Sequence, residues 1–223
     1  MNRYDFHTHT IFSDGSLLPA ALVREAEVRG HAALAITDHV DASNIEDVVR
    51  SLVRFGKEMK GKLPLTYLPG AEISYVKPDY LEEYCRKARK LGAKVIVVHG
   101  ESPVESVYPG TDKIAVSLKG LVDILAHPGN NLTEKDAAQA ARNGIFLEIS
   151  ARRGHREGNR HVLELARKTG AKLLINTDSH SDADLLTYEQ ALLLAKELGM
   201  SDSEAKAALT DNPQELIRRT GSK

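Results

Sequence analysis

The sequence is poor in the residue types that build several common kinds of site. Its 223 residues include one cysteine, Cys85, and no tryptophan, and aromatic residues make up 5% of the chain. A single cysteine excludes an internal disulfide and a thiolate metal cluster. The shortage of aromatic rings argues against a surface for single-stranded nucleic acid, because such surfaces stack bases on aromatic side chains.

The chain also lacks a strong charge imbalance and a long apolar run. Its 30 Lys and Arg residues nearly balance 31 Asp and Glu residues, for a net charge of -1, which argues against a general nucleic-acid coat. No apolar run reaches the roughly 18 residues of a membrane span. The N-terminus lacks the basic segment followed by an apolar segment that is typical of a secretory signal. We therefore expect a cytoplasmic protein without a membrane partner.

Seven short apolar runs alternate with helix-like stretches. This alternation predicts an α/β fold with a parallel sheet, and continuous runs such as Val95-Ile96-Val97-Val98 are typical of a sheet covered on both faces. Seven units in about 180 residues favour a distorted seven-stranded (β/α)7 barrel, similar to the TIM barrel. We expect a single domain over residues 1–223, with C-terminal helices over about 184–219. The expected strands are 3–6, 32–37, 65–73, 94–98, 121–126, 145–149 and 172–176.

Each expected strand carries a histidine or carboxylate at its C-terminal end. In parallel α/β folds this edge is where sites assemble. Six of the nine histidines fall there, and burying so many polar groups together is costly unless each has a partner. A metal cluster would supply that partner. The strand-end residues are His7, His9, His39, Glu72, His99, His127, Glu148, Asp178 and His180.

The residue types and spacing indicate the kind of metal. Imidazole and carboxylate ligands without thiolate suit Zn²⁺, Mn²⁺ or Fe. The pairs His7/His9 and Asp178/His180 are two residues apart, which places both side chains on one strand face. Asp38 and His39 are adjacent, so only one is expected to point inward. We expect His39 to be the ligand and Asp38 to fix its tautomer by accepting a hydrogen bond.

The chain resembles the polymerase and histidinol phosphatase (PHP) family of metal-dependent phosphoesterases. The matching motifs span nearly the whole chain in the family's order. They are His7-Thr8-His9, Ser13-Asp14-Gly15, Thr37-Asp38-His39, Gly70-Ala71-Glu72, His99, His127-Pro128-Gly129, Glu148-Ile149 and Asp178-Ser179-His180. The resemblance implies a distorted seven-stranded barrel with a centre of three divalent metal ions.

The resemblance also implies a set of ligands for each ion. The sets are His7, His9, Glu72 and Asp178 for the first ion; His99 and His127, with Glu72 as a bridge, for the second; and Asp14, His39 and His180 for the third. Three divalent ions bring six positive charges, and three carboxylates among these ligands bring three negative ones. The surplus matches a phosphate monoester dianion plus one metal-bound hydroxide, which would attack phosphorus in line.

Two further segments supply candidates for substrate contact. Arg152 or Arg153, after the sixth strand, is expected to clamp the phosphate, because a guanidinium matches phosphate oxygens with a bidentate fork. His155 is a candidate to face the same pocket. In the loop over residues 100–112, Glu101 and Tyr108 could contact the leaving group or give it a proton. Together with Asp38, these two are the candidate catalytic side chains.

Three functions remain open on the sequence. The leading hypothesis is a phosphatase for a small, histidinol-phosphate-like monoester. A second is a phosphodiesterase or 3′–5′ exonuclease on nucleotides. A third is a non-catalytic scaffold for RNA or a polymerase, which the complete ligand set disfavours. The expected partner is therefore a small phosphorylated substrate, and nucleic acid is disfavoured.

Overall fold

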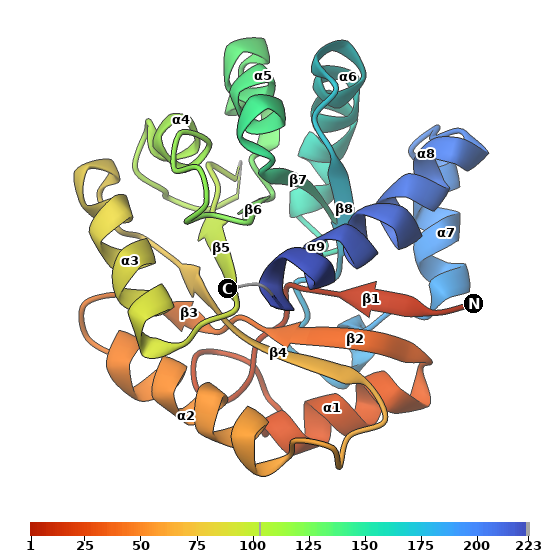
Figure 1. Cartoon of the computed structure of the whole chain (residues 1–223). Helices are drawn as coiled ribbons and strands as arrows, with labels where there is room; N and C mark the ends of the chain where they lie inside the picture. The colour runs from red at the N-terminus through yellow and green to blue at the C-terminus, as the bar shows by residue number, and fades with distance from the viewer. Residues whose placement is uncertain (103, 222–223) are drawn as a thin grey trace.

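Seven parallel strands form a nearly closed barrel with helices around it, and this confirms the expected architecture (Figure 1). The computed structural model describes residues 1–102 and 104–221, so residues 103, 222 and 223 of the expected domain lie outside the described residues. The strands pair in the order β1-β2-β4-β5-β6-β7-β8. They are β1 Arg3–Asp5, β2 His31–Ile36, β4 Thr66–Ile73, β5 Val95–His99, β6 Ile124–Ala126, β7 Phe146–Ser150 and β8 Leu173–Asn176.

Two details of the barrel differ from the expected strands. A further strand of two residues, β3 (His39–Val40), pairs with β4 alone, and it is too short to leave a pattern in the sequence. β6 begins at Ile124, three residues later than expected. Between the first and last strands the barrel is joined by one isolated parallel bridge, from Thr8 to Ser179.

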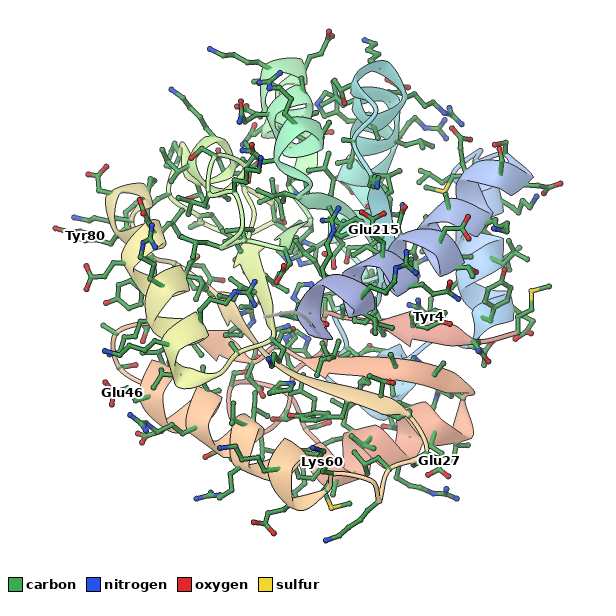
Figure 2. All side chains as sticks on the ribbon, viewed as in Figure 1. Tyr4, Glu27, Glu46, Lys60, Tyr80 and Glu215 are labelled. Atoms are coloured by element: carbon green, nitrogen blue, oxygen red, sulfur yellow. The ribbon has the colours of Figure 1, made fainter. Side chains whose placement is uncertain are left out.

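The helices lie on the outside of the barrel, and charged side chains such as Glu27 and Glu46 project from them (Figure 2). Thr133 caps α5 through a capping box with Asp136, as its position before an alanine-rich stretch predicts. The α-helices are α1 Pro19–Val28, α2 Ile45–Glu58, α3 Leu81–Leu91, α4 Thr111–Ala115, α5 Glu134–Asn143, α6 Asn159–Thr169, α7 Tyr188–Glu197, α8 Asp202–Lys206 and α9 Asn212–Gly221. Short helical turns are η1 Pro78–Tyr80, η2 Gly129–Asn131, η3 His155–Gly158, η4 Asp182–Asp184 and η5 Ala207–Asp211.

The strands are buried on both faces, which explains their continuous apolar runs. In β5, Val95 and Val97 belong to the cluster inside the barrel. Ile96 and Val98 belong to the larger cluster between the strands and the outer helices. Alternate residues therefore face two different apolar layers, and neither layer leaves room for a polar stripe.

α9 runs across one end of the barrel and closes it (Figure 1). Its Leu216 is fully buried in the interior cluster, beside residues of the strands. The side chain of Asn212 donates to the carbonyl of Leu173, at the start of β8, over 2.8 Å. This places α9 at the N-terminal ends of the strands and leaves the C-terminal ends open. Within the described residues, no helix combines the length and the apolar character needed to cross a membrane.

A close backbone approach joins the segments that follow β6 and β7, at the open end. A Cβ atom on Gly158 would lie 2.5 Å from Cα of Gly129, although the φ of −77° at Gly158 suits any residue. We expect Gly158→Ala to lower the free energy of unfolding by about 1–3 kcal/mol, because neither backbone can rotate away. Urea titration would measure the loss. Gly221→Ala is the control, since nothing lies within 4 Å of its Cβ position; equal midpoints for both variants would contradict the prediction.

Candidate metal centre

The histidines of the strand ends meet at the open end of the barrel. The ring of His9 stacks on that of His39 at 4.2 Å and on that of His180 at 4.3 Å, between ring centroids. The rings of His99 and His127 lie 4.5 Å apart. Imidazoles from strands far apart in the sequence thus form one continuous cluster.

The structure brings together all nine residues that the resemblance implies as metal ligands. They fall into four overlapping groups in which the ligand atoms lie within 4.8 Å of one another. The second and third implied sets each occur as a group, with His9 added to the third. The groups are His7, His9 and Glu72; His7, His127 and Asp178; Glu72, His99 and His127; and His9, Asp14, His39 and His180.

Several buried polar atoms in these groups have no hydrogen-bond partner among the described residues. They include Nε2 of His7, both ring nitrogens of His9 and Oε1 of Glu72, whereas Oε2 of Glu72 lies 2.7 Å from Nδ1 of His39. All three side chains are completely buried, so water cannot easily replace the missing partners. A cation bound between them would satisfy these atoms, and the donor set of nitrogen and oxygen without thiolate fits Zn²⁺, Mn²⁺ or Fe²⁺.

The electrostatic surroundings of His9 and Glu72 favour the protonation states that bind metal. Burial lowers the pKa of His9 and nearby His39 lowers it further, well below the ordinary value, so His9 is neutral. Burial opposes ionisation of Glu72, but His7 and His39 hold its pKa well below the usual range. A neutral imidazole and an ionised carboxylate are the states in which these residues coordinate a metal.

Asp14 and Asp178 differ in their environments. Burial would raise the pKa of Asp14, but hydrogen bonding to His180 and the charge of His39 lower it to about 2. Burial raises the pKa of Asp178 to about 7. Asp14 is therefore ionised at neutral pH even without a metal, whereas Asp178 needs a nearby positive charge to become fully ionised.

Glu148 orients the cluster from beneath, a role that sequence reasoning missed. One carboxylate oxygen is 2.8 Å from Nδ1 of His7, and the other accepts the backbone N–H of His127 at 3.0 Å. A hydrogen bond at Nδ1 turns Nε2 of His7 toward the centre and raises the basicity of the ring. The sequence feature that could have indicated this role is the position of Glu148 near the end of a strand, β7, that lies between two strands followed by histidines.

The expectation for Asp38 was wrong. Its carboxylate accepts the backbone N–H and the hydroxyl of Thr10, at 2.7 and 2.8 Å, and the hydroxyl of Ser13 at 2.7 Å. Nδ1 of His39 instead lies 2.7 Å from the hydroxyl oxygen of Ser74. Asp38 therefore fixes the turn after β1, which carries Asp14. Ser74 and Glu72, whose Oε2 is also 2.7 Å from Nδ1, orient His39.

A cavity of about 280 Å³ opens above the cluster. Arg152 contributes to its wall, whereas the neighbouring Arg153 is exposed and lies outside it. Nη1 of Arg152 is 2.6 Å from Nδ1 of His180 and 3.1 Å from the carbonyl oxygen of Asp178. The lining residues are Ser13, Asp14, His39, Asn44, Tyr75, His99, Glu105, Arg152, Asp178 and His180.

The loop over residues 100–112 does not place its two expected catalytic candidates in the cavity. The carboxylate of Glu101 accepts the backbone N–H groups of Gly110 and Asp112, at 2.8 and 3.2 Å, so it closes the loop. Tyr108 is exposed and does not line the cavity. His155 is buried in the wall behind it, with its ring stacked on His127 at 4.1 Å and its Nδ1 2.6 Å from the hydroxyl of Ser102.

Backbone strain concentrates at this end of the barrel. Among the described residues, the non-glycine residues with positive φ are Tyr75, His127 and Asp178. Two of them belong to the metal-ligand groups, and Tyr75 lies over the ring of His99 at 5.2 Å, with half of its surface exposed. Such conformations cost about 1–3 kcal/mol each and persist where the surroundings enforce them, often at functional sites.

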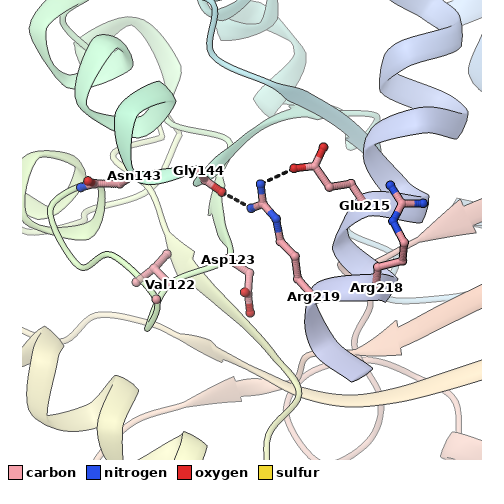
Figure 3. Close-up of a pocket in the computed structure, with 8 residues that line it drawn as sticks. Val122, Asp123, Asn143, Gly144, Glu215, Arg218 and Arg219 are labelled. Carbon is pink, nitrogen blue, oxygen red and sulfur yellow. Dashed lines mark hydrogen bonds and ion pairs between the residues drawn. The ribbon is translucent and has the colours of Figure 1, made fainter. Parts of the chain in front are cut away.

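A larger cavity, about 460 Å³, lies at the opposite end of the barrel beside α9 (Figure 3). Its charged residues are largely engaged with one another, because Arg219 donates to the carbonyl of Gly144 and pairs with Glu215. Asp123 pairs with Arg89. None of its lining residues belongs to the metal-ligand groups, so the cavity at the strand C-terminal ends is the candidate active site.

Comparison with known proteins points to one family. The family model of the PHP domain matches residues 5–198. An uncharacterized protein of Methanocaldococcus jannaschii is 42% identical and covers 97% of this chain and 99% of its own length. Ribonuclease P protein component 3 of Methanosarcina barkeri is 29% identical, over 97% of this chain and 89% of that protein. A probable phosphatase of Thermoanaerobacter pseudethanolicus is 26% identical, over 89% and 87%.

Two solved structures share the fold. A chain in the cryo-EM structure of archaeal ribonuclease P with mature tRNA matches with a TM-score of 0.75 at 14% identity, covering 99% of this chain and 92% of that one. Histidinol phosphate phosphatase from Lactococcus lactis, in complex with zinc, L-histidinol and phosphate, matches with a TM-score of 0.61 at 16% identity, over 90% and 95%. At these identities the likeness concerns the barrel alone.

The geometry around Glu148 generates a prediction about metal affinity. Glu148→Gln keeps the shape of the side chain but removes the negative charge beside Nδ1 of His7, so we expect about 10–100-fold weaker binding of at least one ion. Calorimetric titration with Zn²⁺ would measure it. Glu164→Gln, which removes an exposed carboxylate from α6, is the charge-matched control. Equal affinities in the two variants would show that Glu148 does not tune the centre.

Proposed function

Because this chain belongs to the PHP domain family, we propose that it is a metal-dependent phosphoesterase that hydrolyses a small, histidinol-phosphate-like monoester. The observation that carries the proposal is the cluster of nine potential ligands, six of them buried, directly beneath a cavity that contains an arginine. Up to three divalent ions, Zn²⁺, Mn²⁺ or Fe²⁺, would be held by its overlapping groups. Ions bound there would supply Lewis-acid stabilisation of the phosphoryl oxygens and lower the pKa of water.

Arg152 is the residue best placed to bind the substrate phosphate. Its guanidinium is about one-third exposed and is held by the carbonyl oxygen of Asp178 and the ring of His180. A guanidinium has five N–H donors, so donors remain for phosphate oxygens after these contacts. Because the contacts fix its direction, little rotamer freedom is lost when the phosphate binds.

The cavity itself favours a small substrate. Its volume of about 280 Å³ lies just below the range of about 300–1,000 Å³ typical of sites for drug-sized ligands. Tyr75 is its one aromatic residue other than histidine. An oligonucleotide would need a longer basic groove with several stacking rings. We therefore place the phosphodiesterase or exonuclease hypothesis second among the enzymatic functions.

A non-catalytic role in an RNA-containing assembly is a second candidate. The similarity to Ribonuclease P protein component 3, at 29% identity over 97% of this chain, favours it. In that case the barrel would be a scaffold, and no function would require it to keep its metal-ligand residues. The complete set of strand-end histidines and carboxylates in this chain therefore favours the enzymatic proposal.

One purified sample tests the proposal. Elemental analysis would be paired with a phosphate-release screen of sugar, nucleotide and amino-alcohol monoesters, with Zn²⁺, Mn²⁺ or Fe²⁺ added. We expect two to three ions per chain and release from one class of monoester. Faster cleavage of bis(p-nitrophenyl) phosphate than of p-nitrophenyl phosphate would replace the monoester with a diester. Bound metal with no turnover, together with tight binding of structured RNA, would favour the scaffold.

The two neighbouring arginines provide a matched test of phosphate binding. We expect Arg152→Gln to lower kcat/KM by about 10²–10³-fold, as removal of a preorganised donor to a developing oxyanion does. Arg153→Gln should stay within about twofold, because Arg153 is exposed and lies outside the cavity. Steady-state kinetics on the substrate found in the screen would measure both. Equal losses in the two variants would contradict the assignment of Arg152.

A further inference from the structure

Glu105 reaches from the loop after β5 onto a residue of the metal-ligand groups. Its Oε2 lies 2.6 Å from Nε2 of His99. Nδ1 of the same ring donates to the carbonyl of Gly100 at 3.1 Å, so Nε2 is the nitrogen that faces the centre. Glu105 is therefore beside the atom through which His99 would bind an ion, although the resemblance gives it no role.

The group that contains His99 has room for another ligand. Glu72, His99 and His127 supply three ligand atoms within 4.8 Å of one another. A zinc ion takes at least four ligands, at about 2.0–2.2 Å from nitrogen or oxygen. Two ligands on such an ion at the tetrahedral angle lie roughly 3.4 Å apart. Glu105 would need to withdraw from His99 by less than about 1 Å to share an ion with it.

The negative charge around Glu105 also favours a bound cation. The cavity wall contains Asp14 and Asp178 against a single arginine, Arg152, which lies beside Asp178, and Glu72 is buried directly below. Among the described residues, Glu105 pairs with His99 and with no lysine or arginine. A further carboxylate in this position adds to the mutual repulsion of the acids unless a positive ion lies between them.

The loop holds Glu105 in place from both sides. Before it, Ser102 contacts Nδ1 of the buried His155 at 2.6 Å. After it, Gly110 and Asp112 donate backbone N–H groups to Glu101. These anchors tie the loop to the barrel wall and direct the Glu105 side chain to the cavity, whose lining includes it.

We propose that Glu105 is a tenth ligand of the centre and completes the coordination of the ion bound by Glu72, His99 and His127. The inference rests on the proposed metal centre but not on turnover, because a ligand is detected by metal binding itself. It also makes the loop after β5 part of the centre.

The test is a titration of the metal-free protein with Co²⁺, followed by calorimetry and by the visible absorption of the bound ion. We expect Glu105→Gln to weaken one ion by more than about 100-fold, beyond the roughly 10–100-fold loss caused by removing an outer hydrogen-bond partner, and to change the absorption of that ion. The other ions should keep their affinity. Glu157→Gln, which removes an exposed carboxylate from η3, should behave as the unsubstituted chain.

A double variant identifies which ion is affected. His99→Gln should weaken the same ion, and Glu105→Gln in that background should weaken it further, because a ligand still contacts the ion when His99 is gone. No further loss would overturn the inference, since Glu105 would then act only through His99. Identical isotherms and spectra for Glu105→Gln and the unsubstituted chain would overturn the inference and leave the proposed function intact. An unsubstituted chain that binds no Co²⁺, Zn²⁺ or Mn²⁺ would overturn both.

Discussion

The main constraint on this structure is a cluster of buried polar atoms, several of which have no hydrogen-bond partner among the described residues. Each buried polar group left unsatisfied costs about 1–3 kcal/mol, and more when it is charged. His7, His9 and Glu72 together contribute four such atoms, which is a large cost against the 5–15 kcal/mol by which a domain is typically stable. Cations bound as proposed would remove this cost, so metal binding would also stabilise the fold.

The barrel is built to hold this unfavourable cluster in place. The side-chain oxygen of Asn176 accepts the backbone N–H of Phe6 at 3.0 Å, and its amide donates to Glu148 at 2.9 Å. Glu148 in turn contacts the ring of His7. This chain of hydrogen bonds joins β1, β8 and β7 at the point where the sheet has only one isolated bridge to close it. At the other end, α9 fills the barrel with Leu216, so the metal-ligand edge is the open one.

The sequence predicts the barrel from periodic features, which also place eight of the nine potential ligands at strand ends, whereas the full ligand set with Asp14 follows from the family resemblance. Apolar runs at regular spacing define the strands, and pairs such as His7/His9 share a strand face whatever the loops do. Glu148, Tyr75 and Glu105 were missed because their roles depend on tertiary contacts. The loop after β5 shows the limit clearly: Glu101 and Tyr108 were as plausible as Glu105 from sequence, and only the folded loop separates them. Asp38 was misassigned because Thr10 and Ser13 offer it closer donors than His39.

The same barrel can serve an enzyme or a protein of an RNA assembly, so the fold does not decide the function. The enzymatic and the scaffold function differ in what they require of the residues around the ligand cluster. In this chain the loops after the strands add Arg152, Tyr75 and Glu105 to the cavity above the cluster. A scaffold needs no cationic clamp over a metal centre and no strained tyrosine at its mouth. These residues come from three separate loops and converge on one small cavity, which supports the proposal that the site binds a substrate.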